Sequence, residues 1–433
     1  MSAGGAEAKE APKYTKKDFE SDQDVRWCPG CGDYAILSAV QKTMPDLGIP
    51  KEDIVFISGI GCSSRFPYYM NTYGFHTIHG RAPAVATGLR LARPDLKVFI
   101  VTGDGDGLSI GGNHMLHVLR RNVNVTILLF NNRIYGLTKG QYSPTSELGK
   151  VTKSTPLGSA DRPVNPLAFA LGCGATFVAR TVDRNIAHME EMLRRAAHHK
   201  GAAFVEILQN CNVYNDLAWN VMYDKEQKLQ YELRLEPGKP LLFGPQDDRR
   251  AVIMDGVRPK VVKAKDVAAS ALWVHDETNV NAAKLLADLF APDFPVPIGV
   301  LAAVTGPVYE EIMLDKEQKL QYELRLEPGK PLLFGPQDDR RAVIMDGVRP
   351  KVVKAKDVAA SALWVHDETN VNAAKLLADL FAPDFPVPIG VLAAVTGPVY
   401  EEIMLDQEQK AISERGPGDI AKLLTSGDTW RIS

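Results

Sequence analysis

Two polar motifs follow two apolar runs in the middle of the chain. The first run, residues 98–102, ends on a Gly-Asp-Gly motif whose acid is Asp104, and the second, residues 125–130, ends on an Asn-Asn pair that includes Asn132. Carboxylate and amide oxygens are hard ligands of the kind that Mg2+ binds. The adjacent glycines let backbone N–H groups approach a phosphate at a helix N-terminus. The two motifs together predict a clamp for Mg2+ and a diphosphate.

The elements that must position these motifs are a strand, a glycine turn, a helix and a second strand across residues 97–137. This order is a βαβ unit, so the strands should be parallel neighbours whose carboxyl ends meet at one edge of the sheet. We therefore expect Asp104 and Asn132 to lie close together, although 28 positions separate them. Strands and helices continue to alternate as far as residue 208, which predicts an α/β domain with a mostly parallel sheet.

Other interpretations of the glycine motif fit less well. A Rossmann fingerprint needs a third glycine at the position of Leu108. A P-loop needs Ser or Thr after Gly149-Lys150, where this chain has Val151. A purely structural glycine turn would not explain the Asn-Asn pair that follows the next strand.

Cysteines form a second group of candidate ligands. Cys28 and Cys31 make a C-x-x-C motif, and Cys62 and Cys211 each follow an apolar run. Thiolates that converge from loops and strand ends favour an iron–sulfur cluster or Zn2+. A thioredoxin-like dithiol is a further alternative, although the polar residues 21–26 stand where thioredoxin has a hydrophobic strand. Cys173, in a Gly-Cys-Gly run, is expected to be a buried small residue.

These motifs and their neighbours resemble the β subunits of 2-oxoacid:ferredoxin oxidoreductases. The Gly-Asp-Gly and Asn-Asn pair has the spacing of the thiamine diphosphate motif. The stretches I-G-G-N-H and N-N-R-I-Y-G-L-T-K-G-Q-Y-S-P-T-S are similar to those of the 2-oxoglutarate type. The resemblance covers roughly residues 25–220 and is much weaker beyond them.

The resemblance implies a thiamine diphosphate-binding fold with an irregular C-terminal extension. It also implies oxidative decarboxylation of a 2-oxoacid, with 2-oxoglutarate as the best candidate, by coenzyme A to give acyl-CoA, CO2 and reduced ferredoxin. The implied cofactors are thiamine diphosphate, Mg2+ and one 4Fe–4S cluster. This set is chemically coherent, because the cofactor's carbanion chemistry releases two electrons that a cluster can accept one at a time.

The resemblance also implies roles for individual residues. The cluster ligands would be Cys28, Cys31, Cys62 and Cys211. The Mg2+ ligands would be Asp104, Asn132 and the backbone carbonyl of Ile134. The cofactor contacts would be Ile60, Gly61, Cys62, Ser63, His79, Gly105, Asp106, Gly136 and Leu137. Taken singly, His79 is equally well explained as a structural histidine. Arg65 and Arg81 have two explanations, a surface salt bridge or a contact with a substrate carboxylate or phosphate.

One half of the expected site has no counterpart in the sequence. In the resembling family the cofactor lies between two α/β domains, and an acidic residue of the second domain activates it. We therefore expect the activating Glu on an α subunit, in an αβ heterodimer or its dimer, with ferredoxin, a 2-oxoacid and coenzyme A as further partners. Two alternatives stay open: a non-redox thiamine diphosphate lyase or synthase, and a zinc-stabilised binding protein.

Composition sets broader bounds. A net charge of −3 over 433 residues gives no electrostatic case for nucleic acid or an anionic membrane as partner. No apolar run approaches the roughly 20 residues that span a bilayer, and the N-terminus lacks the apolar core of a signal peptide. Five cysteines are too few for a disulfide scaffold. A cytoplasmic protein is expected.

The C-terminal part consists of a repeated segment. Residues 224–314 and 315–405 are identical over 91 positions, and no folding requirement makes every surface residue identical. A copying event explains this, and we expect only one copy to occupy the native place. The expected organisation begins with a flexible arm at 1–24 and an α/β domain at 25–223 that binds thiamine diphosphate and the cluster. Two copies of an extension follow at 224–314 and 315–405, and a tail at 406–433 ends the chain. Each copy is interpreted as an extended arm over the domain or a partner, or else as a small interaction module.

Overall fold

The computed structural model describes residues 13–255 and 258–314 together with short pieces of the later chain, at 323–325, 331, 333–334, 340–346, 349–357, 359, 387–389, 409–410 and 412–413. The chain divides into two compact units, Met1–Leu314 and Asp315–Ser433. In the part of the chain that the structure describes, no helix has the length and apolar character needed to cross a membrane.

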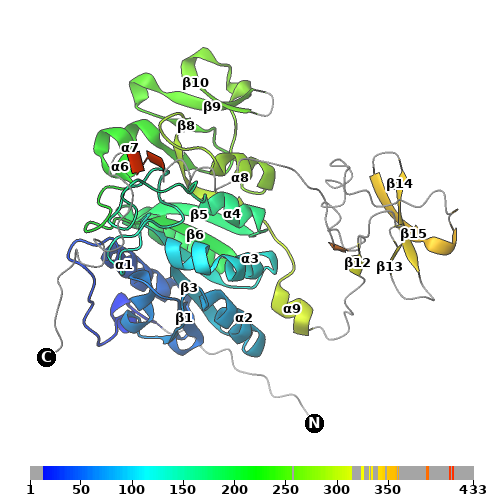
Figure 1. Cartoon of the computed structure of the whole chain (residues 1–433), viewed down its shortest axis with the longest axis horizontal. Helices are drawn as coiled ribbons and strands as arrows, with labels where there is room; N and C mark the ends of the chain where they lie inside the picture. The colour runs from blue at the N-terminus through cyan, green and yellow to red at the C-terminus, as the bar shows by residue number, and fades with distance from the viewer. Residues whose placement is uncertain are drawn as a thin grey trace, which may run out of the picture. The chain divides into compact units, whose positions relative to one another are not determined.

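An eight-stranded sheet organises the first unit (Figure 1), in the order β2-β1-β3-β4-β6-β5-β11-β7. Neighbouring strands are parallel from β2 to β5, whereas β11 runs antiparallel to β5 and parallel to β7. The strands are β1 Ile54–Ser58, β2 Tyr73–His76, β3 Lys97–Gly103, β4 Thr126–Asn131, β5 Phe177–Val182, β6 Ala203–Leu208, β7 Glu232–Leu235 and β11 Val296–Ala303. The predicted α/β class with a mostly parallel sheet is confirmed.

Burial on both faces explains why the central strands are continuous apolar runs. Every residue of β1, β4, β5 and β6 is buried, as expected where helices cover both sides of a parallel sheet. Strands β3 and β4 pair in parallel from Phe99 with Thr126 to Gly103 with Phe130. Their carboxyl ends therefore meet at one edge, as the βαβ interpretation predicted.

Helices form a layer on each face of the sheet (Figure 1). Apolar side chains of α2, α3, α4 and α8 join one core, and those of α1 and α5 join the other. The bounds of these helices are α1 Asp33–Thr43, α2 Ala82–Ala92, α3 Gly112–Arg120, α4 Pro166–Gly172, α5 Ile186–His198 and α8 Val280–Ala287. Three short helices complete the unit: α6 Asn220–Tyr223, α7 Lys225–Tyr231 and α9 Tyr309–Leu314.

The N-terminal segment is more ordered than the flexible arm expected from its composition. A 3-10 turn, η1 (Lys16–Phe19), places Phe19 in the core with no exposed surface, against the ring of Tyr14. Glu20 then pairs with Met70 in an isolated β-bridge. One buried aromatic anchors residues 13–24, and a charged, aperiodic sequence gave no sign of it. Residues 1–12 lie outside the described part of the chain.

The first copy of the repeat completes the main sheet, which differs from the extended arm that we expected. Its strands β11 and β7 extend the sheet beyond β5, and a small antiparallel sheet is formed by β8 Leu242–Phe243, β9 Arg250–Asp255 and β10 Arg258–Lys263. The strand pattern of β11 was hidden by Pro297 and Gly299, residues that are usually depleted in strands. Burial of the whole strand also removes the period-two alternation that would identify it.

The second unit repeats the strands of the first copy. Its described strands are β12 Glu323–Arg325, β13 Leu333–Phe334, β14 Arg341–Asp346, β15 Arg349–Lys354 and β16 Val387–Ile389. Glu323 pairs with Val387 in β12 and β16, as Glu232 pairs with Val296 in β7 and β11. Each pair differs from its counterpart by the 91 positions of the repeat. The same sequence therefore forms the same strand pairing in both places.

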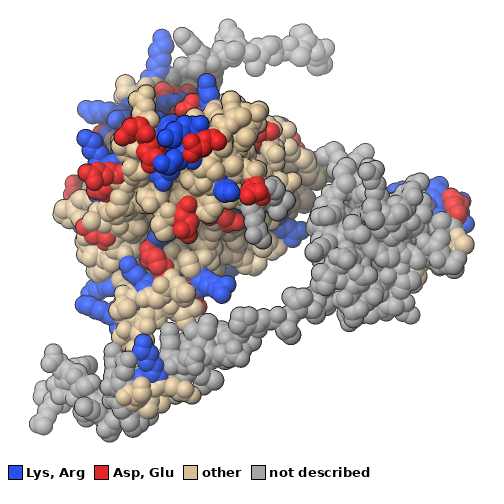
Figure 2. Space-filling view, turned by 90° about the horizontal axis from the view of Figure 1, so that it is seen from above, with Lys and Arg blue, Asp and Glu red and all other residues tan. Residues whose placement is uncertain are grey.

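Charged side chains of both signs are interspersed on the face shown in Figure 2. This mixture agrees with the near balance of 50 Lys and Arg against 53 Asp and Glu in the sequence. A single-sign field over the whole face would be needed for long-range attraction of a polyanion. On this face, charge-based binding would therefore depend on local clusters.

Candidate functional site

The carboxyl ends of β1, β3, β4 and β6 form one edge, where ligands bind in open parallel sheets. A cavity at this edge is lined by all nine residues expected to contact the cofactor and by the three expected Mg2+ ligands. The βαβ unit thus brings Asp104 and Asn132 into the same cavity. The structure places these residues together.

Asp104 is buried, and its carboxylate has two hydroxyl donors. Ser143 Oγ and Thr145 Oγ1 each lie 2.5 Å from Asp104 Oδ2. Burial raises the pKa of Asp104 to about 6, and these hydroxyls act in the opposite direction by stabilising the charged form. A divalent cation in the cavity would favour the same charged form. The chemistry and position of this carboxylate therefore fit a metal ligand.

The two asparagines of the Asn-Asn pair have different surroundings. Asn131 is buried in the protein and donates from Nδ2 to Glu206 Oε1 at 2.7 Å, while its Oδ1 accepts from the backbone N of Arg133 at 3.3 Å. Asn132 lines the cavity, and its Oδ1 accepts from the backbone N of Ile134 at 3.1 Å. The first asparagine therefore holds the strand end, and the second presents its side chain at the cavity.

Asp106 connects the loops around the cavity. Its Oδ1 accepts from the backbone N of Ile60 at 3.0 Å and of Gly80 at 2.7 Å, and its Oδ2 accepts from Thr102 Oγ1 at 2.7 Å. His79 Nδ1 lies 2.5 Å from the same Oδ1. Because one buried carboxylate contacts all of these groups, Asp106 positions Ile60 and His79 at the cavity.

Two glycines show where backbone must come close to the cavity. Gly61 has a φ of +131°, and a Cβ built there would meet no atom within 4 Å, so open space faces its backbone. A Cβ on Gly105 would lie 2.1 Å from the ring of Tyr135, whose hydroxyl donates to the Gly105 carbonyl at 3.0 Å. The first position provides a cradle for a ligand, and the second packs the turn against the cavity wall.

A second cavity, of about 200 Å3, contains the cysteines expected to hold a cluster, Cys28, Cys31, Cys62 and Cys211. Cys173 instead packs, half-buried, against the core on one face of the sheet. In the described residues, no three His, Cys, Asp or Glu side chains stand close enough to hold a single metal ion. The thiols therefore surround a space rather than converge on one point.

The two cavities share a wall. Asp33, Cys62, Asn132, Gly136 and Leu137 line both of them. A Cβ on Gly136 would lie 3.5 Å from Cys211 Sγ and 3.6 Å from Cys62 Sγ. A backbone segment without a side chain therefore forms part of the wall between the two cavities, and Cys62 borders both of them.

The thiol cavity disfavours negative charge. Burial raises the pKa of Cys62 to about 12 and that of Cys31 further above its ordinary value, and the nearby Asp33 adds to both shifts. Burial also raises the pKa of Asp33 to about 7. Arg65, which also lines this cavity, lowers the pKa of Cys62, and the iron ions of a cluster would add further positive charge that favours the thiolates.

A third cavity, of about 600 Å3, shares Ile60, Gly61 and Leu137 with the first. Arg65 lines it, and its NH1 donates to the backbone carbonyl of Arg26 at 2.7 Å. Arg81 contacts His114 of α3. The structure thus places Arg65, but not Arg81, in a cavity that adjoins the one that contains Asp104.

Comparisons with known proteins agree with this geometry. Residues 59–207 match the thiamine pyrophosphate enzyme, C-terminal TPP binding domain. The chain is 55% identical over 298 residues to the 2-oxoglutarate oxidoreductase subunit KorB of Mycobacterium tuberculosis, a match that covers 68% of this chain and 79% of the relative. The chain belongs to the β subunits of 2-oxoacid:ferredoxin oxidoreductases. The β-subunit resemblance seen in the sequence is confirmed.

Other members of the β-subunit family support the assignment. The β subunit of 2-oxoacid:ferredoxin oxidoreductase 1 from Aeropyrum pernix is 46% identical over 223 residues, or 51% of this chain and 69% of the relative. A solved structure of 2-oxoglutarate:ferredoxin oxidoreductase from Magnetococcus marinus, with 2-oxoglutarate, coenzyme A and succinyl-CoA bound, matches with a TM-score of 0.58 at 37% identity. That match covers 71% of this chain and 91% of the solved chain.

Several residues of this β-subunit site were not found from the sequence. Ser143 and Thr145 lie in a polar loop without apolar periodicity, and Asp33 follows the C-x-x-C motif closely. Gln209, 1% exposed, donates from Nε2 to Cys31 Sγ at 3.3 Å. Its place directly after strand β6 and two positions before Cys211 was the available signal.

Proposed function

We propose that this chain supplies the diphosphate-binding and electron-accepting half of a 2-oxoglutarate:ferredoxin oxidoreductase. The reaction is oxidative decarboxylation of 2-oxoglutarate with coenzyme A to succinyl-CoA, CO2 and reduced ferredoxin. The observation that carries this proposal is the shared wall at Cys62 and Gly136, because a cluster held by the thiols would then lie next to a cofactor bound in the Asp104 cavity.

Asp104, Asn132 and the Ile134 carbonyl are proposed to hold Mg2+, which would bind the cofactor's diphosphate. The support is the buried carboxylate of Asp104, the cavity-facing Asn132 and the open cradle at Gly61. Thiamine diphosphate, when bound, supplies carbanion chemistry at the 2-oxoacid carbonyl. The chain's own part is to hold Mg2+ and the diphosphate and, through Asp106, to keep His79 and Ile60 in place.

We propose a 4Fe–4S cluster, rather than Zn2+, at Cys28, Cys31, Cys62 and Cys211. Four thiolates around one Zn2+ ion would need sulfurs within ~4 Å of one another, given Zn–S bonds of about 2.3 Å. The thiols here instead line a cavity and form no single-ion group among the described residues. A polynuclear cluster would be held by thiols spread around such a space and would supply positive charge to the thiolates.

Arg65 is proposed to bind a carboxylate of the 2-oxoacid. It lines the cavity that opens from Ile60, Gly61 and Leu137, and its contact with the Arg26 carbonyl fixes one end of the guanidinium. A guanidinium held in this way has further N–H groups in a planar fork that suits a carboxylate. The third cavity would therefore receive the substrate beside the cofactor.

A partner α subunit is proposed to complete the site. The name "β subunit" carried by the relatives implies such a partner. Among the described residues, one α/β domain contains the diphosphate cavity, and no second domain of comparable size faces it. The activating carboxylate is accordingly proposed to lie on the α subunit.

The test is reduction of a viologen dye by 2-oxoglutarate and coenzyme A, measured anaerobically for this chain alone and with its co-expressed α subunit. The complex should be brown and turn over, and the single chain should not. Pyruvate and 2-oxoglutarate compared in the same assay would test the substrate. A colourless, active complex, or full turnover by the single chain, would overturn the proposal.

A further inference from the structure

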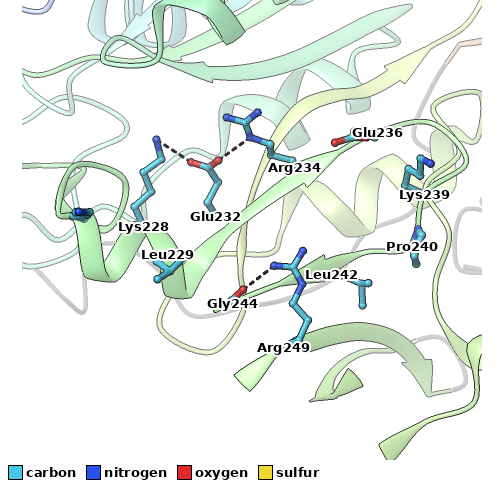
Figure 3. A pocket seen from close by; sticks show the side chains of 11 residues that line it. Lys228, Leu229, Glu232, Arg234, Glu236, Lys239, Pro240, Leu242, Gly244 and Arg249 are labelled. Atoms are coloured by element: carbon cyan, nitrogen blue, oxygen red, sulfur yellow. Dashed lines mark hydrogen bonds and ion pairs between the residues drawn. The ribbon is translucent and has the colours of Figure 1, made fainter. Parts of the chain in front are cut away.

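A pocket outside the catalytic region lies entirely within the first copy of the repeat. It has a volume of about 530 Å3 and is formed by α7, β7, β8 and the turns that follow them (Figure 3). β7 is the last strand of the main sheet, at the opposite edge from β2. The residues that line the pocket fall between positions 225 and 249, so no other segment is needed to build it.

Positive charge dominates the pocket. Five cationic and two acidic side chains line it: Lys225, Lys228, Arg234, Lys239 and Arg249, with Glu232 and Glu236. In Figure 3 the side chains of Lys228 and Arg234 both point toward Glu232, at 3.2 Å and 2.9 Å. Glu232, with a side chain only 13% exposed, therefore fixes these two cations in place.

Three other cations have no acidic partner in the described part of the chain. Lys225, Lys239 and Arg249 form no ion pair there, although Arg249 NH1 donates to the Gly244 carbonyl at 2.8 Å. That bond orients the Arg249 guanidinium over the pocket (Figure 3). The pocket thus has three positive charges in excess of its acids, which a multivalent anion would neutralise.

The shape and remaining lining restrict the anion. The volume lies in the range of roughly 300–1,000 Å3 that is typical of small-molecule sites. Leu229, Pro240 and Leu242 add apolar surface beside the cations. Arg and Lys together are the usual donors to phosphate oxygens. A hollow of this size suits a small phosphorylated molecule with an apolar part better than it suits the face of an acidic protein.

We propose that this pocket binds a nucleotide through its phosphate groups. The base or ribose would contact Leu229 and Leu242, and the phosphates would lie between Arg249, Lys239 and the pair held by Glu232. The same chemistry is present in a free nucleoside diphosphate and in the 3′-phospho-ADP end of coenzyme A. The pocket is a second anion site, separate from the diphosphate cavity at Asp104.

The repeat duplicates the residues that line this pocket. Every lining residue recurs 91 positions later in the sequence, so Lys228 and Arg249 have counterparts at Lys319 and Arg340. The strands β12 and β13 also repeat β7 and β8 in the second unit. The sequence therefore contains the lining residues of the pocket twice.

Binding is measured by isothermal titration of the full-length chain at low ionic strength with ADP, 3′,5′-ADP and inorganic pyrophosphate. ADP should bind at the pocket of the first copy, in addition to any binding at the Asp104 cavity. The paired change Lys228→Gln with Arg249→Gln should lower the number of ADP sites by one. Kd at the altered pocket should weaken at least about tenfold, or 1.4 kcal/mol.

The matched control is Lys265→Gln with Lys284→Gln, which removes the same charge from exposed positions of the first copy outside the pocket. This control should leave the number of ADP sites unchanged. Tighter binding of 3′,5′-ADP than of ADP would identify coenzyme A as the natural ligand. Tighter binding of ADP would identify a free nucleotide as the natural ligand. Equal weakening by the control pair, no detectable binding of the three probes, or binding of an acidic protein such as ferredoxin alone would overturn the proposal.

Discussion

The amide of Gln209 donates a hydrogen bond to the sulfur of Cys31 at 3.3 Å, inside the wall of the thiol cavity. A donor to a ligand sulfur stabilises the reduced, more negative state of an iron–sulfur cluster. Gln209→Leu should therefore shift the midpoint potential to a more negative value. A redox titration followed by electron paramagnetic resonance measures this shift. Gln41→Leu, which removes another buried glutamine, should not change the potential; an equal shift there would contradict the assignment.

Cys173 should not contribute to iron binding, because it packs against the core and does not line the thiol cavity. Cys173→Ala should leave the iron content per chain unchanged. Cys211→Ala should lower the content sharply, since it removes one of the four thiols that line the cavity. The measurement is iron and sulfide analysis of anaerobically purified protein. The reverse pattern would show that the fourth ligand was wrongly chosen.

Asp104→Asn should weaken cofactor binding while the fold is kept. The amide occupies the same volume but cannot provide the charge that Mg2+ requires, so we expect affinity to fall by at least about tenfold. Thermal-shift titration of the αβ complex with thiamine diphosphate and Mg2+ measures the effect. The control is Asp46→Asn, at a half-exposed carboxylate paired with Arg194. This variant should keep the full increase in melting temperature on addition of thiamine diphosphate and Mg2+.

Arg65→Gln should raise KM for 2-oxoglutarate by about tenfold or more, with a smaller change in kcat, if Arg65 binds a substrate carboxylate before reaction. Arg65→Lys should restore part of the affinity because it restores the charge. Arg81→Gln provides the comparison, since Arg81 contacts His114. If only the Arg81 variant raised KM, the substrate carboxylate would bind at Arg81, before the first residue of α2, and not at Arg65.

His188 should make the protein less stable in mild acid. It is 8% exposed in α5 and hydrogen-bonds Thr181, and burial lowers its pKa to about 4 from the ordinary 6.5. Because the unfolded chain binds this proton more tightly, stability is full above pH 6.5 and falls as the pH drops toward 4. Urea unfolding at pH 7 and pH 5 should differ by on the order of 1–2 kcal/mol from this group. His188→Gln should reduce the difference, and the exposed His198→Gln should not.

The sequence was sufficient to predict the centre of the fold and most residues that line the two adjoining cavities. Local patterns carried that information: continuous apolar runs gave β1, β3, β4 and β6, and the residues after them gave Asp104, Asn132, Cys62 and Cys211. A parallel sheet places consecutive strand ends together, so spacing along the chain could be converted into proximity.

What the sequence did not reveal depends on contacts between distant segments. Strand β11 pairs with β5, more than a hundred positions earlier, and its proline and glycine conceal it locally. Ser143 and Thr145 reach Asp104 from a loop without periodicity. Phe19 is buried although its neighbours are charged. No local pattern reports which distant surface a polar loop or a lone aromatic will meet.

The pairing of β11 with β5 has a consequence for a chain that contains the β11 sequence twice. Only one edge of β5 is available, and both copies present it with the same side chains, so their contacts cannot favour either one. Chain entropy must decide. If the second copy took the edge, 91 residues would be closed into a loop, at a cost on the order of 4 kcal/mol. The population in which the first copy pairs with β5 should therefore exceed the population in which the second copy does by about a thousandfold. The second copy stays covalently attached, so the two copies can exchange at this edge.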